Sequence, residues 1–158
     1  MLDLLDMVLA RVAAVTSEEL WDDSVTEGLP VDQQSLVALR LYKGGLPPKE
    51  SAEESENKHP FLAARLLNGV EGVSLGRIKV RLMAGLHTHG TVDDGLVDVD
   101  RLLGFLLQIP ADRNFSPYTM EEGVVWSQGD PKSGLQPHPK YYLTVDLEFT
   151  RAPVMDNY

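Results

Sequence analysis

The stretch that most restricts the fold of this chain is YYLTVDLEFT, residues 141 to 150, because apolar and polar side chains alternate along it. The apolar side chains share one side of an extended chain: Leu143, Val145, Leu147 and Phe149. The polar side chains share the other side: Thr144, Asp146, Glu148 and Thr150. A period of two is typical of a β-strand with one buried and one solvated face. It predicts a half-exposed sheet, as is common among antiparallel sheets.

Four other stretches also predict strands. GRIKVRLMAG, residues 76 to 85, alternates in the same way, with one apolar face formed by Ile78, Val80, Leu82 and Ala84. SLVALRLYKGG, residues 35 to 45, and FLAARLLNG, residues 61 to 69, are rich in strand formers and end at glycines. EEGVVWSQGDP, residues 121 to 131, reads as a short strand that runs into a turn.

Two stretches change to helical spacing. Residues 2 to 15 repeat apolar side chains every three or four positions: Leu2, Leu5, Val8 or Leu9, Val12 and Val15. Residues 97 to 108 do the same with Val99, Leu102, Leu103, Leu106 and Leu107, and Pro110 closes this helix. Asp93, Asp94 and Asp98 surround its expected start, where acceptors and negative charge are favoured.

The order of these elements is helix, three strands, helix, two strands. It predicts an α+β fold, a mostly antiparallel sheet of four to five strands with two main helices packed on one face. With 158 residues, the chain is expected to form a single domain over residues 1–158. We expect a mobile loop at about 46–59, which is rich in Pro, Ser and Glu, and a long loop at about 110–140.

Charge and cysteine content exclude several classes of function. The chain has 14 basic and 24 acidic residues, a formal charge of −10, which disfavours sequence-independent binding to nucleic acid or to an anionic membrane. It has no cysteine, so disulfides, thiolate nucleophiles and zinc–thiolate sites are excluded. The first 15 residues lack the basic start of a secretory signal and the length of a membrane span. We therefore expect a soluble protein of the cytoplasm.

The stretch GLHTHGTVDDG, residues 85 to 95, is the strongest candidate for chemistry. His87 and His89 would share one face of an extended chain, and two imidazoles on one face can chelate a metal, as in a cupin barrel. The binuclear hydrolase pattern His-x-His-x-Asp-His is not met, because Thr91 and Val92 occupy its last two positions. The simpler interpretation, which we favour, is a strand end and a polar turn before a helix.

Other candidate chemistry is weaker. GVSLG, residues 72 to 76, matches the nucleophile-elbow pattern around Ser74, but a predicted strand follows it where the pattern requires a helix. Trp21 and Trp126 are expected in core or interface packing, and Asp146 and Glu148 on the wet face of the sheet. The residues thus predict no catalytic, metal-binding or cofactor-binding site, and a protein that is not an enzyme and works through its surfaces.

The order and patterning resemble the tail-terminator (tail-completion) proteins of long-tailed bacteriophages and their prophages. The resemblance runs from HPFLAARLLNGVEG through GRIKVRLMAGLHTHGTVDDGLVDVDRLLGFLLQIP to YYLTVDLEFTRAPV, and covers roughly residues 1–15 and 35–155. In that family a strand like 60–67 precedes a strand like 78–86. An acidic turn with a glycine, here Asp93, Asp94 and Gly95, leads into a helix like 97–108, and an aromatic-led strand and a proline, here 141–149 and Pro153, end the chain.

The resemblance implies a ring, a hexamer in this family, that caps the tail tube, ends tail polymerisation and provides the surface for head joining. Its partners would be further copies of itself, the tail-tube protein and the head-tail connector protein. DNA would pass through without specific binding, and no membrane is involved. It implies a place in the tail or neck of the virion, after assembly in the host cytoplasm. The alternatives are another neck or tube component, or a small metal-dependent cupin-like enzyme using His87 and His89.

Overall fold

A computed structural model describes residues 2–16, 39–44, 60–70, 76–88, 90–111, 114–130 and 132–151. It contains the helices α1 (Leu2–Val15) and α4 (Val92–Leu106) and the short 3-10 helix η3 (Ile109–Ala111). Its strands are β1 (Arg40–Lys43), β2 (Phe61–Val70), β3 (Gly76–His87), β4 (Asn114–Phe115), β5 (Tyr118–Gln128) and β6 (Lys140–Arg151). The fold is α+β, as predicted. The predicted mobile loop at 46–59 lies outside the described residues.

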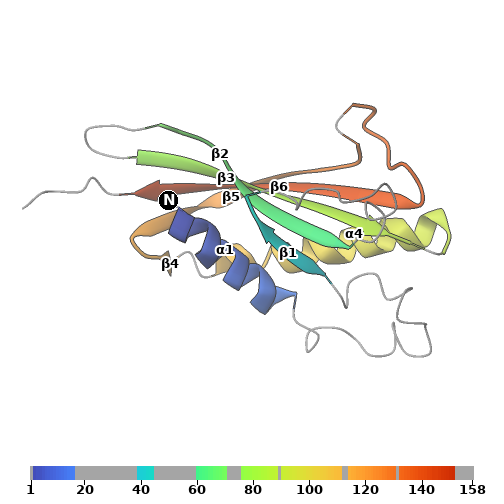
Figure 1. Ribbon diagram of the computed structural model, residues 1–158, viewed down its shortest axis with the longest axis horizontal. Coiled ribbons are helices and arrows are strands. Elements are labelled where there is room, and N and C mark those ends of the chain that lie inside the picture. The colour runs from blue at the N-terminus through green and yellow to red at the C-terminus, as the bar shows by residue number, and fades with distance from the viewer. Residues whose placement is uncertain are drawn as a thin grey trace, which may run out of the picture.

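The strands form one mixed sheet of six strands in the order β1-β2-β3-β6-β5-β4 (Figure 1). β1 pairs with β2 in parallel, and the other neighbours are antiparallel. The prediction of four to five strands in a mostly antiparallel sheet was therefore wrong in strand number and in the β1–β2 pairing. Residues 44 to 60 separate these two strands, which is long enough for the crossover that a parallel pair requires.

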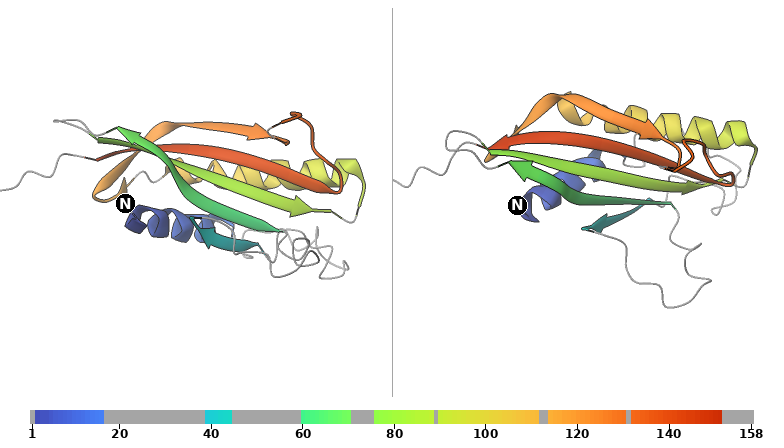
Figure 2. Two further views of the ribbon diagram at one scale, coloured as in Figure 1. Left: turned by 45° about the horizontal axis from the view of Figure 1, so that its top comes forward. Right: turned by 90° about the horizontal axis from the view of Figure 1, so that it is seen from above.

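Both helices cover the same face of the curled sheet, as predicted, and no described helix lies on the other face, which we call the open face (Figure 2). The alternation along β3 and β6 decides which side chains meet the helices. All the side chains predicted to face inward on these strands are buried: Ile78, Val80, Leu82, Ala84, Leu143, Val145, Leu147 and Phe149. They join α1 and α4 in one apolar cluster. The hydrophobic effect of this burial, about 25 cal/mol per Å² of apolar surface, is the main force holding the two layers together.

Helix α1 places Leu4, Leu5, Val8 and Val12 in the core. Val8 therefore points inward, and Leu9 is only partly buried. The end of the helix contains no residue that forbids continuation. Thr16 bonds back to the carbonyl of Val12 through both its N–H, at 3.0 Å, and its Oγ1, at 2.7 Å, which closes the last turn.

Helix α4 begins five residues earlier than the predicted stretch 97–108 because Thr91 caps it. Four of the five predicted core positions are buried, namely Val99, Leu102, Leu103 and Leu106. Leu107 is 44% exposed, contrary to the prediction. It is the C-cap residue, and the chain turns there into η3, where Ile109 enters the core instead.

The predicted long loop at about 110–140 was wrong over much of its length. β4 and β5 form a hairpin in it, and β5 begins at Tyr118, not near residue 121. Tyr118 and Met120 are buried, and the Tyr118 hydroxyl donates to Oδ1 of Asp3 on α1 at 3.2 Å. This part of the strand is built by contacts with a helix that lies more than a hundred residues away in the chain.

Candidate functional site

The histidine stretch lies at the end of the central strand β3. His87 is the last residue of β3 and is partly buried, and His89 lies outside the described residues. Between them, Thr88 is 5% exposed, and its N–H donates to the carbonyl of Pro139 at 2.9 Å. Its hydroxyl oxygen accepts the N–H of Gly90 at 3.1 Å. The strand thus ends in a hydrogen-bonded turn, which agrees with the interpretation of this stretch as a strand end followed by a polar turn.

The acidic residues after the histidines belong to the first turn of α4. Oγ1 of Thr91 accepts the N–H of Asp94 at 3.3 Å, and Oδ2 of Asp94 accepts the N–H of Thr91 at 2.8 Å. This reciprocal pair is a capping box, which satisfies two backbone donors at a helix start. The turn predicted at Asp93, Asp94 and Gly95 was therefore placed too late in the chain, since these residues are already helical.

Gly95 has a packing role in the same turn. A Cβ at this position would lie 2.2 Å from the ring of Tyr141, so only glycine lets the helix approach β6 this closely. Tyr141 is fully buried, and its ring packs edge-on to that of His138. Burial raises the pKa of Tyr141, and the charges of Asp93 and Asp94 raise it further.

The candidate metal pair is described only in part, because His89 lies outside the described residues. Among the residues that the structure describes, no three His, Cys, Asp or Glu side chains gather closely enough to hold a metal ion. His138 lies next to Pro139 in the turn before β6, and its Nδ1 contacts the hydroxyl of Tyr141. The elbow-like residue Ser74 lies outside the described residues.

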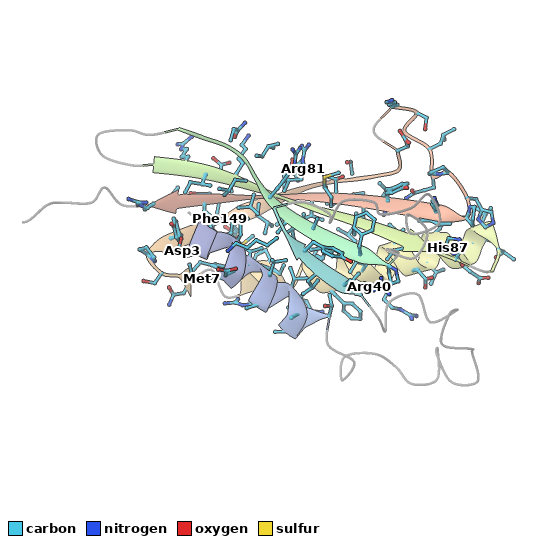
Figure 3. The ribbon with its side chains drawn as sticks, in the orientation of Figure 1. Asp3, Met7, Arg40, Arg81, His87 and Phe149 are labelled. Carbon is cyan, nitrogen blue, oxygen red and sulfur yellow. The ribbon has the colours of Figure 1, made fainter. Side chains whose placement is uncertain are left out.

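On the open face of the sheet, two pairs of opposite charge lie across β3 and β6. Arg81 on β3 binds Asp146 on β6 through two contacts, Nε to Oδ1 at 2.8 Å and Nη2 to Oδ2 at 3.0 Å. Lys79 stands opposite Glu148 in the same register. The hydrogen bonds to Asp146 raise the pKa of Arg81. Figure 3 shows Arg81 on the side of the sheet away from the helices, and Phe149 on the helix side. Asp146 and Glu148 therefore lie on the solvent-facing side of the sheet, as expected.

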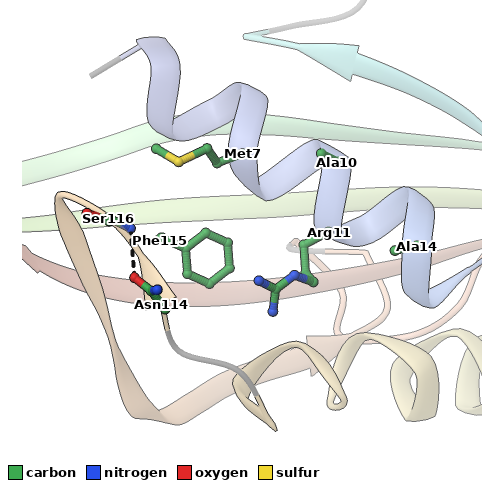
Figure 4. Close-up of a pocket in the computed structure, with 7 residues that line it drawn as sticks. All are labelled: Met7, Ala10, Arg11, Ala14, Asn114, Phe115 and Ser116. Atoms are coloured by element: carbon green, nitrogen blue, oxygen red, sulfur yellow. Dashed lines mark hydrogen bonds between the residues drawn. The ribbon is translucent and has the colours of Figure 1, made fainter.

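A groove of about 400 Å³ lies between α1 and β4, and we call it the α1–β4 groove (Figure 4). It is lined by Met7, Ala10, Arg11, Ala14, Asn114, Phe115 and Ser116. Cζ of Arg11 lies 4.8 Å from the ring centroid of Phe115, a cation–π contact. The Asn114 side chain accepts the N–H of Ser116 at 3.2 Å and shapes the turn. The groove thus combines an apolar floor with one guanidinium.

Large apolar side chains are exposed on several of the described elements. Of the large hydrophobic side chains that are exposed among the described residues, Met83 lies on β3, and all the others lie on α4, β5 or the turn after β5. These others are Val92, Leu96, Val97, Leu107, Val125, Trp126 and Leu135. Gln128 of β5 donates to Oδ1 of Asp100 of α4 at 2.9 Å, which joins the strand to the helix.

β1 and the part of β5 beyond Thr119 lie toward opposite edges of the described sheet, and they differ in charge. β5 carries Glu121 and Glu122, both exposed, in a bulge where the register with β6 shifts between Met120 and Val124. β1, at the other side of the sheet, carries Arg40 and Lys43, also exposed. Lys43 reaches Asp6 of α1 at 2.9 Å. The sequence predicted strands in both regions but not their position at the edges of the sheet, because the edges are known only from the strand order.

Comparison with known proteins adds no family to these observations. No protein-family model matches the chain, and no curated protein matches it. Among the described helices, none is both long enough and apolar enough to cross a membrane.

Proposed function

We propose that this protein is a structural subunit of a bacteriophage tail, a tail terminator that closes the tail tube as a ring. Copies associate head to tail, six in the ring, and the ring ends tube polymerisation and presents a face for the head connector. The resemblance in element order and patterning is the origin of this proposal. The described surfaces support it in the three ways that follow.

The observation that carries the proposal is the exposure of large apolar side chains on β5 and α4. Trp126 is 49% exposed and Val125 is 71% exposed on neighbouring positions of an outer strand. Tryptophan is among the residues most enriched in the energetic centres of protein interfaces. An exposed tryptophan on such a strand therefore favours a contact with another protein.

The two sides of the sheet favour a ring over a closed dimer. Along β5 the exposed charges are Glu121 and Glu122, and along β1 they are Arg40 and Lys43, so charge favours contact between the two different edges. Contacts between two different patches are heterologous, and they form a ring when the rotation from copy to copy closes. The formal charge of −10 also suits a channel through which DNA passes without adhering.

The cupin alternative requires a strand where this chain has α4. A cupin barrel continues from its His-x-His pair into the next strand, whereas Val92–Leu106 is a capped helix that packs on β6 and β3. A neck or tube component remains the nearest alternative, because such subunits also form rings.

The test combines solution mass with tube capping. Light scattering behind a sizing column, over a wide range of concentration, should show a discrete ring or a monomer that converts to one. The purified protein, added to polymerising tail-tube protein from the same genome, should stop elongation. A ring that leaves elongation unchanged would indicate a neck component. A monomer at every concentration that also leaves the tubes unaffected would contradict the proposal.

A further inference from the structure

We infer that neighbouring copies join by antiparallel pairing of the β5 edge of one copy with the β1 edge of the next, so that the sheet continues around the ring. This inference deepens the proposed function and rests on it. It identifies the partner of the β5 edge as a second copy of this chain and predicts which residues face each other.

The backbone of β5 has an open side. The N–H of Gly129 donates to the carbonyl of Tyr142 at 3.0 Å, and such bonds recur at every second residue of an antiparallel pair. Val125 and Ser127 therefore bond toward β6, and Val124, Trp126 and Gln128 direct their N–H and C=O groups outward. β4, the described strand beyond β5, pairs only with Tyr118 and Thr119.

The backbone of β1 has a matching side. The N–H of Arg40 donates to Pro60 at 3.1 Å, and that of Gly44 donates to Ala64 at 2.7 Å. Because these donors fall on alternate residues, Leu41 and Lys43 direct their N–H and C=O groups away from β2. Within the described part of the chain, no strand pairs with this side of β1.

The strand directions fit a head-to-tail contact. β1 runs parallel to β2, and each step from β2 through β3 and β6 to β5 reverses direction, so β1 and β5 run in opposite directions. The two strands lie at opposite sides of the sheet (Figure 2). A second copy added in the same orientation therefore places its β1 antiparallel to the β5 of the first.

One register matches apolar side chains on both faces. Pairing Leu41 with Trp126 places both on the helix face, since their register partners Leu62 and Val145 are buried there. The same register pairs Tyr42 with Val125 on the open face. Cross-strand pairs of aromatic with aliphatic side chains stabilise sheets, so this register is favoured over a shift by two residues.

Charge favours a β5–β1 contact over contact between two β5 edges. In this register Lys43 lies opposite Val124, next to the bulge that carries Glu121 and Glu122. Two β5 edges would bring four of these carboxylates into one interface. Copies of a chain with a charge of −10 repel one another in general, so contact of β5 with β1, a strand that carries no carboxylate, is favoured over contact between two β5 edges.

Engineered cysteines test the register, and the natural chain contains none that would interfere. We expect Tyr42→Cys with Val125→Cys to form an intermolecular disulfide under copper–phenanthroline oxidation, and to give a ladder of denaturation-resistant species up to the full ring. Opposed residues in an antiparallel pair lie about 4.5–5.5 Å apart at Cα, within the range that a disulfide spans. The matched control is Tyr42→Cys with Ser127→Cys, on the same face but two residues out of register. We expect it to cross-link about tenfold less.

The single variant Val125→Cys distinguishes the other geometry. If it alone gives a covalent dimer, and the double variants give no higher species, two β5 edges meet and the inference is wrong. If the unmodified protein forms a ring and neither double variant cross-links, the ring uses other surfaces. That outcome overturns the edge pairing and leaves the proposed function intact. If the unmodified protein forms no ring and does not cap tubes, both fail.

Discussion

β6 and β5 lie side by side, with 12 and 11 residues, yet their burial differs sharply. Along β6, every second side chain is buried from Tyr141 to Phe149. Along β5 the alternation stops after Met120, and Val125 and Trp126 are exposed. β6 has a neighbour on each side, whereas β5 beyond Thr119 pairs with β6 alone among the described strands. Strand propensity is a local property, but burial depends on which elements lie next to the strand.

The largest expected effect comes from a charge in the centre of β6. Val145→Asp should cost at least about 4 kcal/mol, enough to unfold the domain, because it buries an unpaired carboxylate. Val145 is completely buried. The matched change on β5, Val125→Asp, should cost less than about 1 kcal/mol, mainly through repulsion by Asp146 opposite it. Urea denaturation followed by circular dichroism measures both. Similar losses in the two variants would show that β5 is buried in solution.

The buried and exposed faces of α4 allow the same comparison, with smaller expected changes in the free energy of unfolding. Gly95→Ala should destabilise the fold by about 1–3 kcal/mol, since its methyl group would overlap the Tyr141 ring. Gly104→Ala, on the exposed face with nothing within 4 Å of the new Cβ, should stabilise it by about 0.5–1 kcal/mol through helix propensity. Thermal melts of the two variants provide the comparison. Stabilisation by Gly95→Ala would mean that α4 lies further from β6 than described.

Loss of the α4 cap should have a moderate effect. Thr91→Ala removes the hydroxyl that accepts the N–H of Asp94, at a cost of about 1 kcal/mol. Thr91→Ser keeps a hydroxyl and should remain within a few tenths of a kcal/mol of the natural protein. Urea midpoints compare them. If the serine variant is as unstable as the alanine variant, the contribution of Thr91 is not its hydroxyl.

The smallest effect at neutral pH concerns the Tyr141 hydroxyl. Its pKa in the fold is raised by burial and by Asp93 and Asp94, above its ordinary value of about 10. A raised pKa favours the neutral form in the fold. Its stabilising contribution is therefore complete below pH 10 and is lost as the pH rises through the folded value.

The free energy of unfolding should thus fall as the pH rises above about 10, and Tyr141→Phe should weaken this dependence. Part of the dependence should persist in the variant, because burial and Asp3 also raise the pKa of Tyr118. Unfolding by urea at pH 8 to 11 measures the slope. An unchanged slope in Tyr141→Phe would exclude Tyr141 as its source.

Local sequence patterns predicted the central strands β3 and β6, which have a neighbouring strand on each side, and the core face of α4. The inward faces of β3 and β6 followed from alternation alone, and four core positions of α4 followed from helical spacing. The helix start was placed too late because Thr91 was not recognised as its cap. The turn character of the histidine stretch was also predicted, since Asp93, Asp94 and Asp98 favour a helix start.

The start of β5 was not predictable in the same way. Its first half follows β4 through Pro117 and is held by Asp3 of α1 and by β6, and its second half follows a bulge at Glu121 and Glu122. The proline before the strand and the bulge within it interrupt the alternation of apolar and polar residues that identifies a strand. The α1–β4 groove was missed for a related reason, because Arg11 and Phe115 meet only in the folded chain.

The sequence by itself determined the apolar faces of the central strands and helices, the capping of α4 and the acidic character of the whole surface. Periodicity and capping depend on residues within a few positions of each other, so they can be read along the chain. Only the tertiary structure decided that β1 pairs with β2 in parallel, that β5 lies outside β6, and that Trp126 is exposed at an edge. Pairing between distant strands depends on the combined packing of all layers, and local preference does not specify it.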